Sequence, residues 1–305
     1  MKTLICKVNA EKPEQDIISQ AGKILREGGL VAFPTETVYG LGGNALDAAA
    51  SEKIYAAKGR PSDNPLIVHI ARMEDLEKIV TGVPKKAKIL AEACWPGPLT
   101  MILPKSEEVP YETTGGLDSV AVRYPSHPVA QALILAAGGF VAAPSANTSG
   151  RPSPTTAAHV QEDLTGAVDM ILDGGQVGIG IESTIVDFTE KIPTVLRPGY
   201  ISLEKLKELL GEVKMDKGLL RADASQRPKA PGMKYRHYAP KAELTIVEGS
   251  TEYVVAYINQ KAKEASKRGR QIGIIGTEET FPYYSSGVVR CIGSRKKEEG
   301  IALHL

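Results

Sequence analysis

Cations and a histidine gather in residues 58–69, and these residue types can bind anionic ligands. Lys58 and Arg60 precede a proline-stiffened loop, and His69 follows within an otherwise apolar run. Arginine can grip a phosphate through two hydrogen bonds, and lysine can act as a point charge. The structural alternatives are a solvated charge pair at a helix end and a buried core histidine. The density of unusual residues within twelve positions favours a binding site.

A second candidate pair is Ser119 and Arg123, which lie four residues apart in an apolar run. On a strand this spacing places both side chains on the same face. An arginine with apolar neighbours needs an anionic partner, because burial of an unpaired charge is costly. Either a carboxylate of this chain or a ligand carboxylate or phosphate can satisfy Arg123.

Short hydroxyl and amide residues fill several other turns that follow predicted strands. Residues 143–153 contain a serine- and asparagine-rich run, which suits hydrogen bonds to phosphates and ribose. Hydroxyls also alternate along residues 35–39, where a polar edge strand is an equally good interpretation. Further candidates in these turns are Thr37, Ser145, Asn147, Ser153, Ser183 and Arg197.

The candidate residues include almost no general base or nucleophile. Such a set suits a reaction driven by positioning and charge neutralisation, and nucleotidyl transfer from ATP is one. The chain has no phosphate-binding loop with a terminal Gly-Lys-Ser/Thr, no His-Glu-x-x-His and no clustered His/Cys set. Residues 40–45 resemble a dinucleotide fingerprint but do not follow their strand directly, so we interpret them as a tight turn.

Alternating helix and strand patterns predict a mixed α/β sheet flanked by helices, with the polar turns at strand ends. An amphipathic helix at 203–210 closes this first domain near residue 211. Helices are predicted at 14–27, 47–57, 73–80, 84–93, 127–137 and 203–210, and strands at 30–33, 66–70, 99–103, 120–124, 139–143, 169–172, 184–188 and 194–196.

Residues 212–240 lose this periodicity and have the proline and glycine content of a linker. They carry seven basic and three acidic side chains, whereas residues 1–211 carry 20 basic and 25 acidic ones. Residues 241–305 predict a small βαβ unit, with strands at 243–248, 271–276 and 288–292 and a helix at 253–267. This second domain is expected to be short or truncated.

Composition excludes several classes of protein. Lys plus Arg number 37 and Asp plus Glu 36, so no chain-wide field favours general nucleic-acid or membrane-surface binding. No apolar run approaches the roughly 20 residues of a membrane span. The three cysteines are far apart and odd in number, which fits a reducing cytoplasm.

Four motifs in one order carry a family resemblance. They are Lys58-x-Arg60-Pro, Pro144-Ser-Ala-Asn147, Glu182-Ser-Thr184 and His237-Tyr-x-Pro240. Over about residues 14–211 the chain resembles the YrdC-type threonylcarbamoyl-AMP synthases. The linker and the last residues are similar to the two-domain form, which has a Rossmann-like C-terminal domain.

This resemblance implies that L-threonine, bicarbonate or CO2, and ATP form threonylcarbamoyl-AMP and pyrophosphate. The product would pass to a threonylcarbamoyl-transferase complex that acts on tRNA, with weak or absent direct tRNA binding. Mg²⁺ would be held mainly by the ATP phosphates, without protein ligands, and residues 212–240 would act as a lid.

The resemblance also implies residue roles, with Lys58 and Arg60 as the catalytic pair. L-Threonine would be held by Thr37, His69, Arg123, the backbone of Ala143, and Ser183. ATP would be held by Lys58, Arg60, Asn64, Ser119, Ser145, Asn147, Ser153, Arg197 and Arg236. Two other functions stay open: an RNA-binding or ribosome-associated module without ATP turnover, and a carbamoyl transferase.

Overall fold

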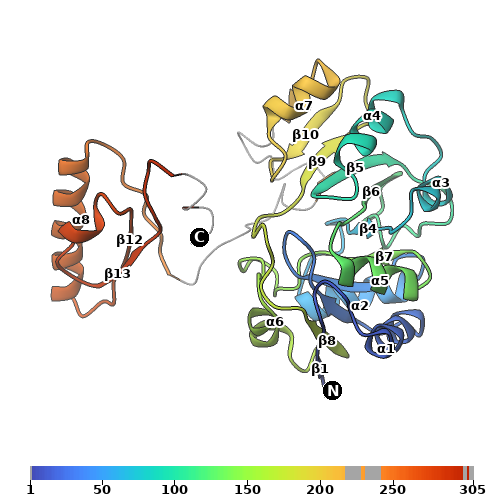
Figure 1. The fold of residues 1–305 in the computed structure, drawn as a ribbon, viewed down its shortest axis with the longest axis horizontal. Coiled ribbons are helices and arrows are strands. Elements are labelled where there is room, and N and C mark those ends of the chain that lie inside the picture. Colours follow the sequence, from blue (N-terminus) through green and yellow to red (C-terminus); the bar gives the residue numbers. More distant parts are fainter. Residues whose placement is uncertain (1, 217–227, 231–241, 298–300, 302–305) are drawn as a thin grey trace. The chain divides into compact units, whose positions relative to one another are not determined.

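The computed structural model describes residues 2–216, 228–230, 242–297 and 301 (Figure 1). The chain divides into two units, Met1–Ala239 and Pro240–Leu305, and each is described by itself. The predicted boundary near 211 and the predicted lid at 212–240 stay predictions, because much of that segment lies outside the described residues.

An 11-stranded mixed sheet organises the first unit, which confirms the predicted fold class. Its order is β1-β8-β2-β3-β7-β4-β6-β5-β9-β10-β11, with parallel and antiparallel neighbours. The strands are β1 (Leu4–Lys7), β2 (Val31–Phe33), β3 (Gly40–Asn44), β4 (Ile67–His69), β5 (Leu99–Pro104), β6 (Ser119–Arg123), β7 (Val141–Ala142), β8 (Met170–Asp173), β9 (Thr184–Asp187), β10 (Thr194–Arg197) and β11 (Lys214–Met215).

The helices form where apolar spacing and end signals coincide. In α2 the Asp47 side chain accepts a hydrogen bond from the backbone of Ala49, and Gly59 ends the helix with a left-handed φ of 59°. The helices of this unit are α1 (Gln15–Arg26), α2 (Ala48–Lys58), α3 (Leu76–Ile79), α4 (Lys85–Cys94), α5 (Pro128–Ala136), α6 (Ala157–Leu164) and α7 (Leu203–Leu210), with a 3-10 turn at Met73–Asp75.

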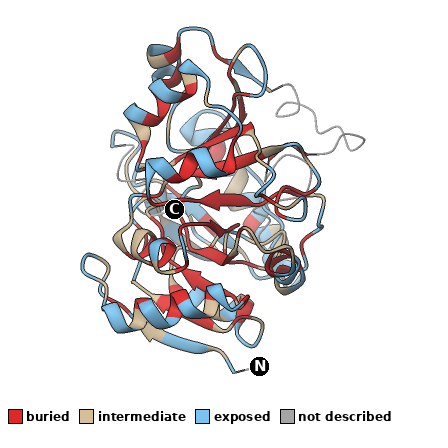
Figure 2. Cartoon of the chain, turned by 90° about the vertical axis from the view of Figure 1, so that its right-hand side faces the viewer, coloured by how far each residue is buried: buried red, intermediate tan, exposed pale blue. Residues whose placement is uncertain are grey.

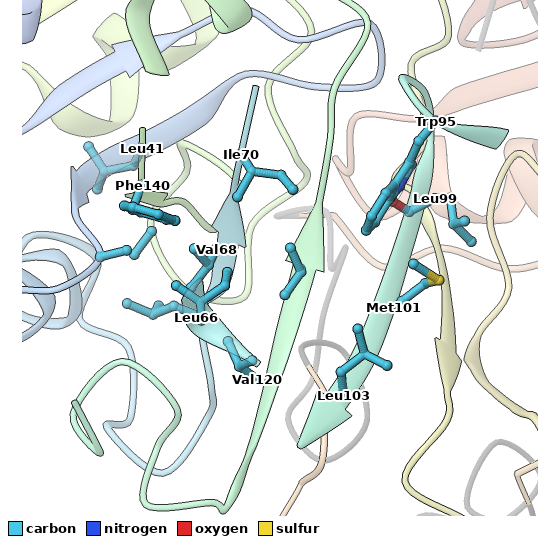
Figure 3. Close-up of a cluster of buried hydrophobic side chains, with 14 of the residues drawn as sticks. Leu41, Leu66, Val68, Ile70, Trp95, Leu99, Met101, Leu103, Val120 and Phe140 are labelled. Carbon is cyan, nitrogen blue, oxygen red and sulfur yellow. The ribbon is translucent and has the colours of Figure 1, made fainter. Parts of the chain in front are cut away.

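Packing on the two sheet faces differs, and this difference positions the site. One cluster joins α1 and α5, which lie side by side (Figure 1), to one face, and a larger cluster joins α2, α4, α6 and α7 to the other. Figure 2 shows that the central strands are mainly buried, whereas the helices also carry exposed residues. Val68 of β4 points into the larger cluster (Figure 3), as does Val122 of β6. Because strand side chains alternate, their neighbours His69 and Arg123 face the other side of the sheet.

Two sequence interpretations were wrong. Residues 40–45 are not a tight turn, because Gly40–Asn44 pairs with β2 and β7 as strand β3. A Cβ at Gly42 would approach a side-chain atom of Val141 to 2.9 Å, so glycine here permits close strand packing. Residues 243–248 form no strand, since Leu244 and Ile246 are largely exposed and no described segment pairs with them.

The second unit therefore lacks the predicted strand–helix–strand order. Helix α8 (Thr251–Lys267) comes first, and β12 (Gly273–Gly276) then pairs in parallel with β13 (Val288–Cys291). A short 3-10 turn, Phe281–Tyr283, lies in the connection between the two strands. None of the helices in the described ranges combines the length and apolar character that crossing a bilayer requires.

Candidate active site

A row of polar side chains crosses the sheet face opposite the larger core cluster. In the strand register His69 of β4 lies beside Arg123 of β6, and Arg123 lies beside Thr100 of β5. Register neighbours point to the same face of a sheet. All three residues are buried. The sheet therefore brings together residues 69, 100 and 123, which no local sequence pattern connects.

His69 is held as a neutral imidazole. Burial, and then the positive charge of Arg123, lowers the pKa of His69 from 6.5 to about 3. Its Nδ1 lies 3.0 Å from the carbonyl oxygen of Ile67, which accepts a hydrogen bond from the ring. The site thus has a neutral hydrogen-bonding group beside a fixed cation.

Arg123 has an internal counter-ion. Its Nη2 lies 2.8 Å from Oε1 of Glu36, and both side chains are largely buried. Of the two possibilities that the sequence left open, a carboxylate of this chain thus contacts the guanidinium. The Nε atom of Arg123 has no hydrogen-bond partner among the described residues, so the residue keeps capacity for an anion.

Ser183 extends the polar row on the other side of Thr100. The two hydroxyl oxygens are 2.7 Å apart. Arg197, at the end of β10, donates to the Ser183 carbonyl oxygen at 3.0 Å and to its hydroxyl at 3.2 Å. These bonds fix the position of Ser183, directly before β9.

The turn after β7 is held by hydrogen bonds from several directions. Ser145 donates to Oδ1 of Asn147 at 2.6 Å, and the Asn147 amide donates to the carbonyls of Thr148 and Arg151. The Lys58 ammonium donates to the carbonyl oxygens of Ser145 and Asn147. Burial, and then the charge of Arg60, lowers the pKa of Lys58 well below its usual value.

Arg60 is separated from Lys58 by Gly59, which has a left-handed backbone. Its Nε and Nη2 donate to the carbonyls of Asn64 and Pro65, at 3.2 and 2.9 Å. Arg60 lines the cleft, whereas Lys58 does not. Both cations of the motif therefore hold loop carbonyls, and Arg60 also lines the cleft.

These groups surround one cleft. Four arginines and one glutamate line it, so the cleft is positive although residues 1–211 carry a net negative charge. The lining residues are Thr35, Val38, Gly40, Arg60, Ile67, His69, Arg123, Ala143, Pro144, Ser145, Asn147, Arg151, Ser153, Glu182, Ser183 and Arg197.

Nine of the predicted site residues thus share this cleft, and four others among the described residues do not line it. Lys58 is directed at loop carbonyls, and Thr37 is buried, with its hydroxyl 2.9 Å from that of Thr35. Asn64 is buried with an unpaired Oδ1, and Ser119 lies at the opposite end of β6 from Arg123. Arg236 lies outside the described residues.

Five polar residues at or beside the cleft were not among the predicted site residues. Thr100 could have been found as the polar residue within the apolar strand 99–103, and Glu36 as an acid within the turn 35–39. Arg151 and Glu182 have partners that only the fold supplies, Asp163 and Ser153 respectively. The fifth is Thr35, whose hydroxyl donates to the Val38 carbonyl at 2.6 Å. Within the described ranges, no cluster of three or more His, Cys, Asp or Glu side chains could hold a metal ion.

Comparison with known proteins decides the family. A family model for Sua5, YciO and YrdC proteins, described as "Telomere recombination", matches residues 23–199. A second, described as "Threonylcarbamoyl-AMP synthase, C-terminal domain", matches residues 201–305. The chain belongs to the Sua5-type threonylcarbamoyl-AMP synthase family. The predicted family and its enzyme class, a nucleotidyltransferase, are therefore confirmed.

Individual members of this family align with most of the chain. A threonylcarbamoyl-AMP synthase of Pyrococcus abyssi is 50% identical over 90% of this chain and 80% of its own length. One of Bacillus subtilis is 50% identical over 94% of this chain and 82% of its own length. The crystal structure of P. abyssi Sua5 complexed with L-threonine has a TM-score of 0.91 and 47% identity, and covers 99% of this chain and 87% of that chain.

Proposed function

We propose that this chain condenses L-threonine, bicarbonate or CO2, and ATP into threonylcarbamoyl-AMP and pyrophosphate. The observation that carries the proposal is the single cleft in which a buried Arg123 faces hydroxyl-rich loops and further arginines. The Sua5 relative that binds L-threonine supports an amino-acid substrate. The names of the curated relatives support the adenylate product.

The amino acid is assigned to the sheet side of the cleft, with Arg123 as partner of its carboxylate. His69, Ser183 and the backbone of Ala143 lie within the same lining, and Thr37 supports it through Thr35. A substrate hydroxyl among buried hydrogen-bonding groups allows rejection of valine, because valine would leave those groups unpaired.

The nucleotide is assigned to the loop side, with Arg60 and Arg197 facing the phosphates and Ser145, Asn147 and Ser153 offering hydroxyl and amide groups. Lys58 acts here by holding the turn after β7, since its ammonium contacts two of the turn's carbonyls. Asn64 and Ser119 stay candidates behind this lining, and Arg236 stays a candidate in the linker. The magnesium ion enters with ATP, held by its phosphates.

The chemistry needs no protein nucleophile. The ammonium group of bound threonine loses one proton, and the neutral amine then attacks CO2 and loses a second proton, which gives a carbamate. A carbamate oxygen then attacks the α-phosphorus in line, and the bond from that phosphorus to the bridging oxygen breaks as pyrophosphate leaves. Arginines that neutralise the developing charge, together with correct positioning, supply the catalysis.

The linker is proposed to close over the cleft. At its described part, Ala230 is fully buried against the sheet face that carries Ile67, a residue of the cleft. Lys229 contacts Asp187 at 3.3 Å and Glu190 at 2.9 Å. Deletion of residues 229–240 should abolish threonine- and bicarbonate-dependent pyrophosphate release, and unchanged release would contradict the lid.

A labelling assay tests the proposed reaction directly. Radiolabelled bicarbonate should enter an AMP adduct with threonine, much less with serine, and least with valine. Arg60→Ala and Ser183→Ala should lower this incorporation. If the protein instead retains RNA in a salt-sensitive manner and turns over no ATP, the RNA-binding alternative holds.

The product is a mixed anhydride that water hydrolyses, so we propose direct transfer in the cytoplasm to a threonylcarbamoyl-transferase complex that modifies tRNA. The proposal includes weak or absent binding of tRNA to this chain itself, given the net negative charge of residues 1–211.

A further inference from the structure

Two oppositely charged side chains beside the cleft, Glu36 and Arg123, contain most of the buried polar atoms that make no hydrogen bond in the described part of the chain. Six buried side-chain polar atoms lack a hydrogen-bond partner among the described residues, and four of them belong to Glu36 and Arg123. Of these four atoms, Oε1 of Glu36 and Nη2 of Arg123 pair with each other, which leaves Oε2 of Glu36 and Nε of Arg123 without a described partner. The two groups are 2.8 Å apart, and the Arg123 side chain is only 5% exposed.

Such a pair is energetically incomplete by itself. A buried ion pair offsets its desolvation only when further hydrogen bonds satisfy the remaining lone pairs and protons. A ligand that completes this pair must offer an anionic acceptor to Arg123 and a cationic donor to Glu36, within a few ångströms of each other. The carboxylate and ammonium of an α-amino acid, which share one carbon atom, have this arrangement.

We infer that Glu36 receives the α-ammonium group of the amino acid while Arg123 holds its carboxylate. Glu36 is then a specificity-determining residue, and the pair selects a zwitterion over a hydroxy acid. A ligand without the ammonium leaves one oxygen of the buried carboxylate without a partner, and such unpaired buried groups allow a site to discriminate strongly. This inference rests on the proposed function and adds the residue that recognises the amine.

The test compares two ligands on matched variants of the full chain. Calorimetric titration measures L-threonine and 2,3-dihydroxybutanoate, the analogue in which a hydroxyl replaces the ammonium. Glu36→Gln should weaken threonine binding by about 10- to 100-fold, the contribution of a hydrogen bond to a charged group, and leave the analogue's affinity unchanged or higher.

Glu11→Gln is the control for loss of one negative charge. Glu11 is exposed, and its charge, like that of Glu36, raises the pKa of His127 against the larger lowering by burial. This variant should keep the wild-type ratio of the two affinities. If Glu36→Gln does not fold, Glu36→Asp serves instead, because it retains the charge but withdraws the carboxylate. It should lower the affinity for threonine more than the affinity for the analogue.

If the Glu36 variants lower the affinities for both ligands equally, the ratio of the two affinities is unchanged. The ion pair is then purely structural and the inference is wrong. If Glu36→Gln changes the ratio of the two affinities as expected but the wild type forms no adenylate, the inference is supported and the proposed reaction is contradicted. Adenylate formation with an unchanged ratio contradicts only the role of Glu36. Failure of the wild type to bind any amino acid overturns both.

Discussion

The two units of the chain differ in how completely they bury their side chains. In Met1–Ala239, core clusters cover the faces of an 11-stranded sheet, and charged groups such as Arg60 and Arg123 are buried beside the cleft. In the described part of Pro240–Leu305, the buried apolar side chains are Val254, Ala262 and Ile274. A buried cation needs a surrounding shell that supplies acceptors, and the first unit provides one.

Matched substitutions in the two units should therefore have unequal effects. Ile54→Ala removes a fully buried side chain from the large cluster and should lower the free energy of unfolding by about 2–5 kcal/mol. Ile274→Ala, at a residue outside the three core clusters, should cost less than about 2 kcal/mol.

Trp95 is the sole tryptophan, so its fluorescence during urea unfolding reports the first unit. Hydrogen exchange of β12 reports the second. Equal losses for the two isoleucine variants would remove the basis for treating the units as energetically different.

Arginine substitutions extend the comparison to activity. Arg60→Ala should reduce pyrophosphate release by about 10²- to 10³-fold, because a preorganised donor facing the phosphates is lost. Arg290→Ala, at an exposed position on β13, should change the rate less than twofold. A large effect of Arg290→Ala would place part of the catalytic apparatus in the second unit.

The stability of the first unit should fall below pH 6.5. The folded-state pKa of His69 is about 3, below its unfolded value, so its contribution is complete above pH 6.5 and is lost as the pH falls toward 3. The loss should reach about 1.4 kcal/mol per pH unit. His69→Gln should remove this slope in urea titrations followed by Trp95 fluorescence. A slope that persists in the variant would assign it to other groups.

The second unit should respond to acid at lower pH and more weakly. Glu279 accepts hydrogen bonds from the Ser294 hydroxyl at 2.6 Å and from the Arg295 amide at 3.0 Å, and its pKa is lowered from 4.5 to about 2. Its contribution should be present above pH 4.5 and fade toward pH 2. Hydrogen-exchange protection of β13 should show this loss, and Glu279→Gln should abolish the pH dependence. Protection that is independent of pH in the wild type would contradict it.

Much of the first unit could be predicted from local patterns. The helices at 15–26 and 203–210 follow from amphipathic spacing with end signals, and most buried strands from short apolar runs. Strand β3 was missed because Gly40–Asn44 has the composition of a turn and becomes a strand only between two partners. The prediction of a strand at 243–248 was wrong for the converse reason. This segment has the composition of a strand, but no described segment pairs with it.

The residue types of the candidate site could be predicted from the sequence, but the positions of their side chains could not. Lys58 and Arg60 belong to one motif and both donate to loop carbonyls, yet only Arg60 lines the cleft. Glu36 was missed because an acid in a polar turn has no distinctive local signal.

The sequence by itself determined the alternation of helices and strands, the residue types available for binding anions, and the family. The tertiary structure decided which of these residues meet. Strand register placed His69, Arg123 and Thr100 in one row, and long-range packing brought Glu36 to Arg123. The physical reason is that side-chain direction and burial depend on partners distant along the chain, whereas sequence periodicity reports only local geometry.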